Sequence, residues 1–171
     1  MIAGGTVIVV AEPRWLDDDE QAAWRAFLAA TRLLFARLDR ELQRDASMPH
    51  AYYEILVRLS EAPEQTLRMS QLADVLQSSR SRLSHAVARL EAAGWVRREV
   101  SPTDRRGQLA VLTDAGLATL ATAAPGHVAG VRHHLFDQLE PSQVSQLREI
   151  SERLLAHLER EPGLDVESKG P

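Results

Sequence analysis

The 171-residue sequence contains no cysteine, and only 5% of its residues are aromatic. The lack of cysteine excludes disulfide bonds, thiolate metal sites and thiol-based redox sensing. No purely apolar stretch is longer than Val7–Ala11, which is far shorter than the ~20 residues that span a bilayer. No Lys or Arg precedes this stretch, so it is not typical of a signal peptide. We therefore expect a cytoplasmic protein with no membrane partner.

Motifs of the common enzyme classes are also missing. The sequence has no G-x-S-x-G elbow, no P-loop, no Rossmann glycine run and no spaced pair of carboxylates. We therefore expect neither an enzyme nor a bound cofactor. The residues are 44% hydrophobic and 26% charged, which is typical of a globular protein that folds without disulfides or metals.

The charge of the chain is unevenly distributed. The whole chain has a formal net charge of −4. The window from Arg68 to Gly107 holds eight arginines against four acidic residues, so it carries +4 and the rest of the chain carries −8. An acidic protein with one basic segment indicates a local surface for a negatively charged partner.

The N-terminal part of the sequence predicts one long helix. Residues 1–14 lack helical periodicity and are expected to form an arm. Residues 15–46 begin with a run of acidic residues, which suits a helix N-terminus, and continue with apolar residues every three or four positions. This apolar stripe is longer than a small core requires, which indicates that the helix also packs against a partner helix.

The central part, residues 47–113, predicts three shorter helices and a β-hairpin. The first helix follows Met48-Pro49 and ends before Pro63, and the second is capped by Ser70. The third is capped by Ser78 or Ser79 and ends at a C′ glycine, Gly94. Residues 95–100 and 108–112 read as two strands joined by a turn over 101–107. This order predicts a winged helix-turn-helix, so the fold class is mainly α with a small β-hairpin wing.

The C-terminal part, residues 114–160, predicts two more helices. Thr113 caps the first, which extends to about Leu139 and is expected to be kinked or interrupted at Pro125-Gly126. The last helix begins near Pro141. Residues 161–171 have the composition of a flexible tail.

The helix that follows Ser79 has one face suited to a DNA major groove. At 100° per residue, Leu83, Val87 and Leu90 share one face, and the opposite face carries small and hydrogen-bonding side chains flanked by arginines. The basic turn of the hairpin suits the adjacent minor groove. The candidate DNA-binding residues are Ser79, Arg80, Ser81, Arg82, Ser84, His85, Arg89, Asp104, Arg105 and Arg106.

Two segments carry a resemblance to a known family. "LADVLQSSRSRLSHAVARLEAAGWV" and "SPTDRRGQLAVLTDAG" resemble the helix-turn-helix and wing of MarR-family transcriptional regulators. The resemblance implies an obligate homodimer, with residues 15–46 and 114–160 in dimerisation and 47–113 in DNA binding. It also implies that Asp104 pairs with Arg106 to order the wing. His85 stands where many members carry arginine, so the family's base preference does not transfer.

The resemblance further implies how the protein would work. We expect a repressor that binds a pseudo-palindromic operator in double-stranded DNA and is released by a small aromatic or anionic effector. Trp15, Trp24, His50 and Tyr53 are the candidate ligand-binding residues, because such effectors bind where the dimerisation helices meet the DNA-binding lobe.

Two other functions stay open at this point. One is a metal-responsive regulator of the same fold, because His127 and His134 are seven residues apart and could share a helix face. No motif such as HExxH supports it, so no metal ligands are assigned. The other is an adaptor that uses the winged fold to bind protein. Such an adaptor would need no positive field, so it is distinguished by the effect of salt on duplex affinity.

Overall fold

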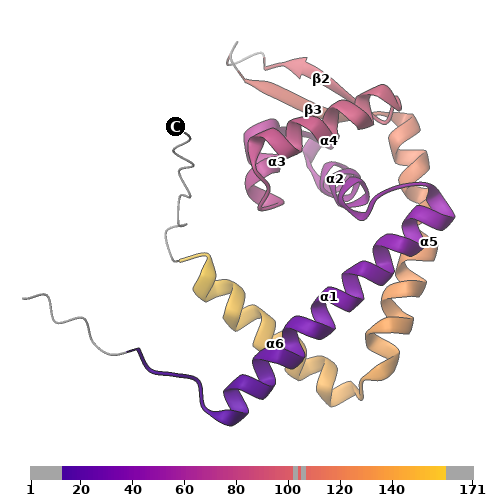
Figure 1. The fold of residues 1–171 in the computed structure, drawn as a ribbon. Coiled ribbons are helices and arrows are strands. Elements are labelled where there is room, and N and C mark those ends of the chain that lie inside the picture. The colour runs from indigo at the N-terminus through magenta and orange to yellow at the C-terminus, as the bar shows by residue number, and fades with distance from the viewer. Residues whose placement is uncertain (1–12, 102–103, 105–106, 161–171) are drawn as a thin grey trace, which may run out of the picture. The chain divides into compact units, whose positions relative to one another are not determined.

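The structure, a computed structural model, describes residues 13–101, Asp104 and residues 107–160. Figure 1 shows helices α1, α2, α3, α4, α5 and α6 and strands β2 and β3. The elements are α1 (Asp18–Ala46), α2 (His50–Glu61), the 3-10 helix η1 (Pro63–Gln65), β1 (Thr66–Arg68), α3 (Met69–Val75), α4 (Arg80–Ala92), β2 (Val96–Val100), β3 (Gln108–Leu112), α5 (Asp114–His134), the 3-10 helix η2 (Phe136–Gln138) and α6 (Pro141–Leu158). The predicted fold class, mainly helical with a small wing, is confirmed. The tail 161–171 and all of the arm except Pro13 and Arg14 lie outside the described residues.

The chain divides into two compact units, and the division falls within α1. The first unit ends at Ala36 and the second begins at Arg37. In the first unit the helix start is capped reciprocally: the Glu20 N–H donates to Asp17 Oδ1 at 2.8 Å, and the Asp17 N–H donates to Glu20 Oε2 at 3.0 Å. The acidic first turn predicted from the sequence is therefore present, and it lies at the positive end of the helix dipole.

The core of the second unit lies between the three short helices and the sheet. Figure 1 shows α2, α3 and α4 gathered beside strands β2 and β3. Helices α2, α3 and α4 each turn apolar side chains inward, and β2 adds Val96. The largest fully buried side chains are Met48, Leu56, Leu59, Leu72, Val87, Leu90 and Val96. This core holds α4 in place with its opposite face outward.

The sheet has a third strand that the sequence did not predict. The strand order is β1-β3-β2, and both pairings are antiparallel. Strand β1 has only three residues, too few to show the alternation that identifies a strand. Helix α3 begins directly after it at Met69, so the expected cap at Ser70 is wrong: the N-cap position is Arg68, whose N–H donates to Gln71 Oε1 at 3.2 Å.

Both ends of α4 are fixed by the residues that the sequence indicated. Of the two candidate N-caps, Ser79 is the one used: its hydroxyl accepts a hydrogen bond from the Arg82 N–H at 3.3 Å. At the other end Gly94 adopts φ +76°, the left-handed conformation that favours glycine. The Trp95 N–H then donates to the Leu90 carbonyl at 2.9 Å, which completes the helix stop.

Helix α5 corrects one prediction from the sequence. Thr113 caps it as predicted, accepting from the Gly116 N–H at 3.0 Å. The helix then runs through Pro125 to His134 without a break, so of the two expected outcomes, a kink or an interruption, the interruption does not occur. An interior proline costs ~3 kcal/mol, but Pro125 is exposed while Ala123 and Gly130 on either side are buried. Packing on both sides of the proline therefore maintains the helix.

Helix α6 begins at Pro141 as predicted, after the η2 turn. The Glu140 N–H at its start donates to Gln143 Oε1 at 2.9 Å. No helix within the described ranges combines the length and the apolar character needed to cross a bilayer.

Candidate nucleic-acid interface

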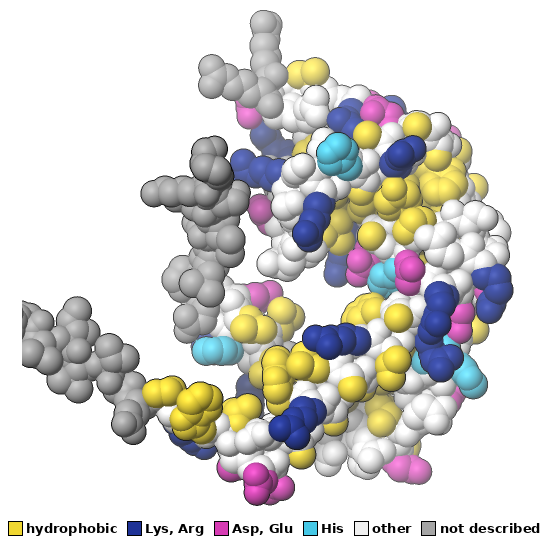
Figure 2. Space-filling model, viewed as in Figure 1, with side chains coloured by type: hydrophobic (Ala, Val, Ile, Leu, Met, Phe, Trp, Pro, Cys, Tyr) yellow, Lys and Arg dark blue, Asp and Glu magenta, His cyan; other side chains and the backbone are white. Residues whose placement is uncertain are grey.

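The outer face of α4 is solvent-exposed along its length. Leu83, Val87 and Leu90 are buried, so the side chains opposite them point away from the core. Figure 2 shows dark-blue basic side chains over the region of α4. The exposed residues of this helix and its cap include the candidates Ser79, Arg80, Ser81, Arg82, Ser84, His85 and Arg89, together with Ala88. The α4 outer face, as we call this set, is narrow because most of the side chains between its flanking arginines are serine or alanine, with His85 among them.

The start of α4 adds to the positive potential of this face. The first turn of the helix contains no acidic residue, and Arg80 and Arg82 are exposed there. A helix N-terminus carries a partial positive charge and presents backbone N–H groups. A phosphate placed at this end would therefore meet both the helix dipole and two guanidinium groups.

The two strands of the wing are described, but part of its turn is not. Strands β2 and β3 pair from Val96↔Leu112 to Val100↔Gln108. Asp104 is exposed between them, while Arg105 and Arg106 lie outside the described residues. The pairing of Asp104 with Arg106 that the family resemblance implies therefore stays a prediction.

Arg98 ties the wing to α4, a role that the sequence did not reveal. Its guanidinium lies 3.3 Å from Glu91 Oε2 and donates to the Ser84 carbonyl at 3.2 Å, and its N–H donates to Glu91 Oε1 at 3.1 Å. Arg97, by contrast, is exposed and pairs with Glu99 at 2.6 Å on its own strand. Arg98 thus links β2 to the middle of α4, whereas Arg97 is strand surface.

A polar groove lies between the start of α4, the start of α3 and the base of the wing. Its volume is about 490 Å³, and it is lined by Arg68, Met69, Ser70, Arg80, Ser84, Asp104, Gly107 and Gln108. Arg80, Ser84 and Asp104 were candidates from the sequence. Arg68, Ser70 and Gln108 were not, because the strand that brings Arg68 to the wing is too short to be recognised.

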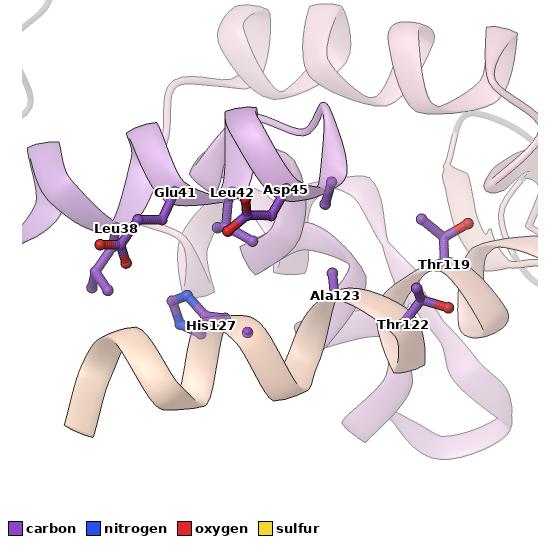
Figure 3. Close-up of a pocket in the computed structure, with 10 residues that line it drawn as sticks. Leu38, Glu41, Leu42, Asp45, Thr119, Thr122, Ala123 and His127 are labelled. Atoms are coloured by element: carbon purple, nitrogen blue, oxygen red, sulfur yellow. The ribbon is translucent and has the colours of Figure 1, made fainter. Parts of the chain in front are cut away.

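A second cavity, of about 240 Å³, lies between the C-terminal part of α1 and α5. Figure 3 shows Leu38, Glu41, Leu42 and Asp45 of α1 facing Thr119, Thr122, Ala123 and His127 of α5. Its walls are largely apolar, but two carboxylates border it. Glu41 Oε1 lies 2.6 Å from His134 Nε2. Hydrogen bonds from Arg44 lower the pKa of the Asp45 carboxyl, so this group stays charged.

His127 lies between this cavity and two of the candidate ligand-binding residues. Its ring centroid is 4.4 Å from that of Tyr53 and 5.4 Å from that of His50. Burial lowers the pKa of His127, and the neighbouring His50 adds to this effect while Glu41 opposes it. The buried Nδ1 of His127 has no hydrogen-bond partner among the described atoms. His50 and Tyr53 thus contact a residue that lines the cavity but do not line it themselves.

The other two candidate ligand-binding residues belong to the first unit. Trp15 is 83% exposed and Trp24 is 52% exposed, and the Trp24 ring lies 6.4 Å from that of Phe27.

The histidines do not form a metal site in the described part of the chain. No group of three or more His, Cys, Asp or Glu side chains within the described ranges is arranged to hold an ion. His134 instead pairs with Glu41, and His127 packs on His50 and Tyr53.

The sequence matches a family model and several curated proteins. The model of the MarR family matches residues 46–107. The chain is similar to the transcriptional repressor MprA of Escherichia coli, with 30% identity over 105 residues, which cover 61% of this chain and 59% of that protein. It is also similar to the transcriptional regulator PecS of Dickeya dadantii, with 33% identity over 52% of this chain and 53% of that protein. These matches thus span less than two thirds of either relative.

Two solved structures are similar over most of the chain. Sco3205, a MarR family transcriptional regulator from Streptomyces coelicolor solved in complex with DNA, has a TM-score of 0.84 and 53% identity, and the match covers 90% of this chain and 94% of that one. AbsC, a MarR family transcriptional regulator from the same organism, has a TM-score of 0.80 and 46% identity, with 86% of this chain and 99% of that one covered.

Proposed function

We propose that this chain, which belongs to the MarR family of transcriptional regulators, binds a specific site in double-stranded DNA through the α4 outer face and the wing. The observation that carries this proposal is the exposed, narrow face of α4, with no acidic residue in its first turn and arginines on its flanks. A helix of this kind fits a major groove, where base edges are read. The structure of Sco3205 in complex with DNA supports it as a relative at 53% identity.

We propose that residues 47–113 form the DNA-binding part and that residues 15–46 and 114–160 pair two copies into a homodimer. The apolar residues that support the pairing are exposed in the single chain. In the first unit Phe27 is 55% and Leu33 is 61% exposed, and in α6 Ile150 is 58% and Leu158 is 66% exposed. Figure 2 shows yellow hydrophobic side chains in a row along α1. Exposed apolar stripes of this length are typical of helices that pack against a partner.

A homodimer would place two α4 helices in successive major grooves, about 34–36 Å apart, on a pseudo-palindromic operator. The turn between β2 and β3 would then reach the flanking minor grooves. A protein bound in this way across a promoter blocks polymerase, so repression is the regulatory outcome that we propose. MprA, a relative at 30% identity, is named a transcriptional repressor.

The salt dependence of duplex binding tests this function against the protein-binding adaptor. The account predicts that affinity falls about 10³-fold or more between 50 and 200 mM salt, because several phosphate contacts release counterions. Arg82→Gln is expected to reduce the magnitude of the log–log slope by about 0.9 per subunit contact. Arg58→Gln on α2, which removes another exposed arginine outside the interface, is the matched control and should leave the slope unchanged. Duplex affinity that is independent of salt would favour the adaptor instead.

We also propose that the cavity between α1 and α5 binds the effector, and that this effector is a small neutral or cationic molecule. A cavity of 240 Å³ is smaller than most drug-sized sites, so it admits about one ring with a short substituent. The carboxylates of Glu41 and Asp45 border it and offer hydrogen-bond acceptors to a ligand that carries N–H or O–H groups, so we propose such a ligand in place of the anionic effector expected from the resemblance. A ligand that prefers one separation of the two DNA-binding lobes would shift the dimer away from DNA.

Thermal unfolding tests the charge of the effector. Benzylamine at millimolar concentration is expected to raise the unfolding midpoint by 1 to 2 °C, roughly what a ligand near its Kd gives through mass action, whereas benzoate is not. Thr119→Leu, which fills part of the cavity with carbon, is expected to abolish the shift without changing duplex affinity. Equal stabilisation by benzoate, or an undiminished shift in the filled variant, would contradict this site.

A further inference from the structure

The carboxylate of Asp104 in the wing turn is contacted by an arginine that lies far away in the sequence. Arg68 Nη1 is 3.5 Å from Asp104 Oδ2, across a separation of 36 residues. Both side chains are partly exposed, at 38% for Arg68 and 49% for Asp104. The contact therefore joins the residue that precedes α3 to the wing turn.

The backbone of Arg68 is anchored on both sides. Its Cα is paired with Leu109 of β3 in the β1–β3 ladder. Its N–H donates to Gln71 Oε1 at 3.2 Å, and the next residue begins α3. Because β1 and α3 are both part of the packed unit, the guanidinium projects from a fixed point toward the wing.

Gly107 leaves the space in which this pair forms. Its N–H donates to the Asp104 carbonyl at 2.8 Å, and its own carbonyl accepts from the Ser101 N–H at 2.9 Å. A Cβ at position 107 would lie 3.2 Å from Arg68 Nη1 and 3.2 Å from Asp104 Oδ2. These distances are tight for carbon, so a side chain here would require the guanidinium and the carboxylate to shift by a few tenths of an ångström.

We propose that Arg68 is a positioning residue for DNA binding, which holds the wing turn against the start of α3 through Asp104. This inference rests on the proposed function and names a residue outside the α4 outer face and the wing turn. The negative charge of Asp104 balances that of Arg68, so the pair adds little net attraction for phosphate. The pair instead restricts the wing before DNA binds. The wing therefore loses less conformational entropy when it enters a minor groove.

The pair is exposed enough that its loss should not unfold the protein. Exposed ion pairs of this kind contribute little to stability. We therefore expect Arg68→Gln, Asp104→Asn and the double variant to fold normally and to bind duplex DNA about 3- to 10-fold more weakly. Either substitution alone already removes the Arg68–Asp104 contact. The double variant should therefore lose no more affinity than each single variant. Gly107→Ala keeps both charges and should reproduce part of the loss.

Three measurements on the full chain separate this role from direct phosphate contact. With Arg68→Gln, the salt slope of duplex binding should stay at the wild-type value, whereas loss of a phosphate contact would reduce its magnitude by about 0.9. Hydroxyl-radical protection should weaken at the flanking minor grooves and persist in the major-groove half-sites. Without DNA, amide hydrogen exchange of Ser101 and Gly107 should become faster.

The results of these measurements separate the positioning role of Arg68 from the proposed function of the protein. A reduced slope with additive single and double effects, or unchanged affinity and unchanged exchange at Ser101 and Gly107, would overturn the positioning role of Arg68. The charge-reversed pair Arg68→Asp with Asp104→Arg should recover slow exchange at these two amides, and failure to do so would also count against the role. A wild-type protein that binds no duplex would instead overturn the proposed function, while the exchange measurement would still report on the Arg68–Asp104 contact.

Discussion

Ala88→Glu is expected to abolish specific DNA binding and leave the fold intact. Ala88 is exposed on the α4 outer face, one turn after Ser84 and His85. A glutamate there would place a bulky negative group where base edges and phosphates approach. Affinity for the operator should fall to the non-specific level, a loss of 10³-fold or more, or about 4 kcal/mol. Fluorescence anisotropy with a labelled operator measures this loss.

Two control variants separate the effect of charge at position 88 from the effect of bulk and from the effect of charge elsewhere on the protein. Ala88→Gln adds similar bulk without charge and should cost less than Ala88→Glu, because electrostatic repulsion is absent. Ala51→Glu places the same charge on an exposed alanine of α2 and should leave operator affinity within about twofold. If Ala88→Glu bound the operator like the wild type, α4 would not be the helix in the groove.

The double variant Ile150→Asp with Leu154→Asp is expected to produce a monomer. These residues lie four apart on α6 and are 58% and 49% exposed in the single chain. Each residue is still about half exposed, so burying the rest of its side chain against a second copy would contribute roughly 1 kcal/mol, and both copies of the dimer gain this contribution. Two carboxylates at these positions would have to be desolvated without partners, so pairing should fail.

Sedimentation measures the mass of this variant, and operator binding reports the consequence. A monomer binds one half-site only, so the affinity gained by linking two half-sites, often 10²- to 10⁴-fold, should be lost. Ser142→Asp with Ser145→Asp adds the same two charges at exposed positions in the first two turns of α6, near the helix N-terminus, where acidic residues suit the dipole, and this variant should stay dimeric. A monomeric wild type, or a dimeric Ile150/Leu154 variant, would refute the pairing through α6.

Features set by neighbouring residues could be predicted from the sequence. The Ser79 and Thr113 caps and the glycine stop at Gly94 all follow from local hydrogen bonding and backbone preference, and the structure contains each of them. The exposed face of α4 also followed from periodicity alone, because Leu83, Val87 and Leu90 recur at helical spacing and are buried.

Features set by packing could not be predicted. Strand β1 exists because β3 pairs with it, and three residues carry no pattern of their own. The unbroken α5 depends on buried neighbours of Pro125 that outweigh its cost. The cap of α3 was misplaced for the same reason, since the strand before the helix sets its start.

The candidate site also combines features set by neighbouring residues with features set by packing. The residues of the α4 outer face were found from their spacing, whereas Arg68 and Arg98 act through contacts with residues far along the chain or on another element. The ligand-binding candidates were chosen for aromatic character. The structure brings His50 and Tyr53 to the cavity-lining His127, but the acidic border of Glu41 and Asp45 depends on how α1 packs on α5.

Selection of bound fragments from random duplex DNA tests the central claim most directly. The purified protein is incubated with the pool at physiological salt, and the retained duplexes are sequenced. We expect enrichment of one pseudo-palindrome whose half-sites are centred about 10 to 10.5 base pairs apart, and we expect Ala88→Glu to lose this enrichment. Retention without any shared sequence, or a motif without two-fold symmetry, would contradict a dimer that reads DNA through α4.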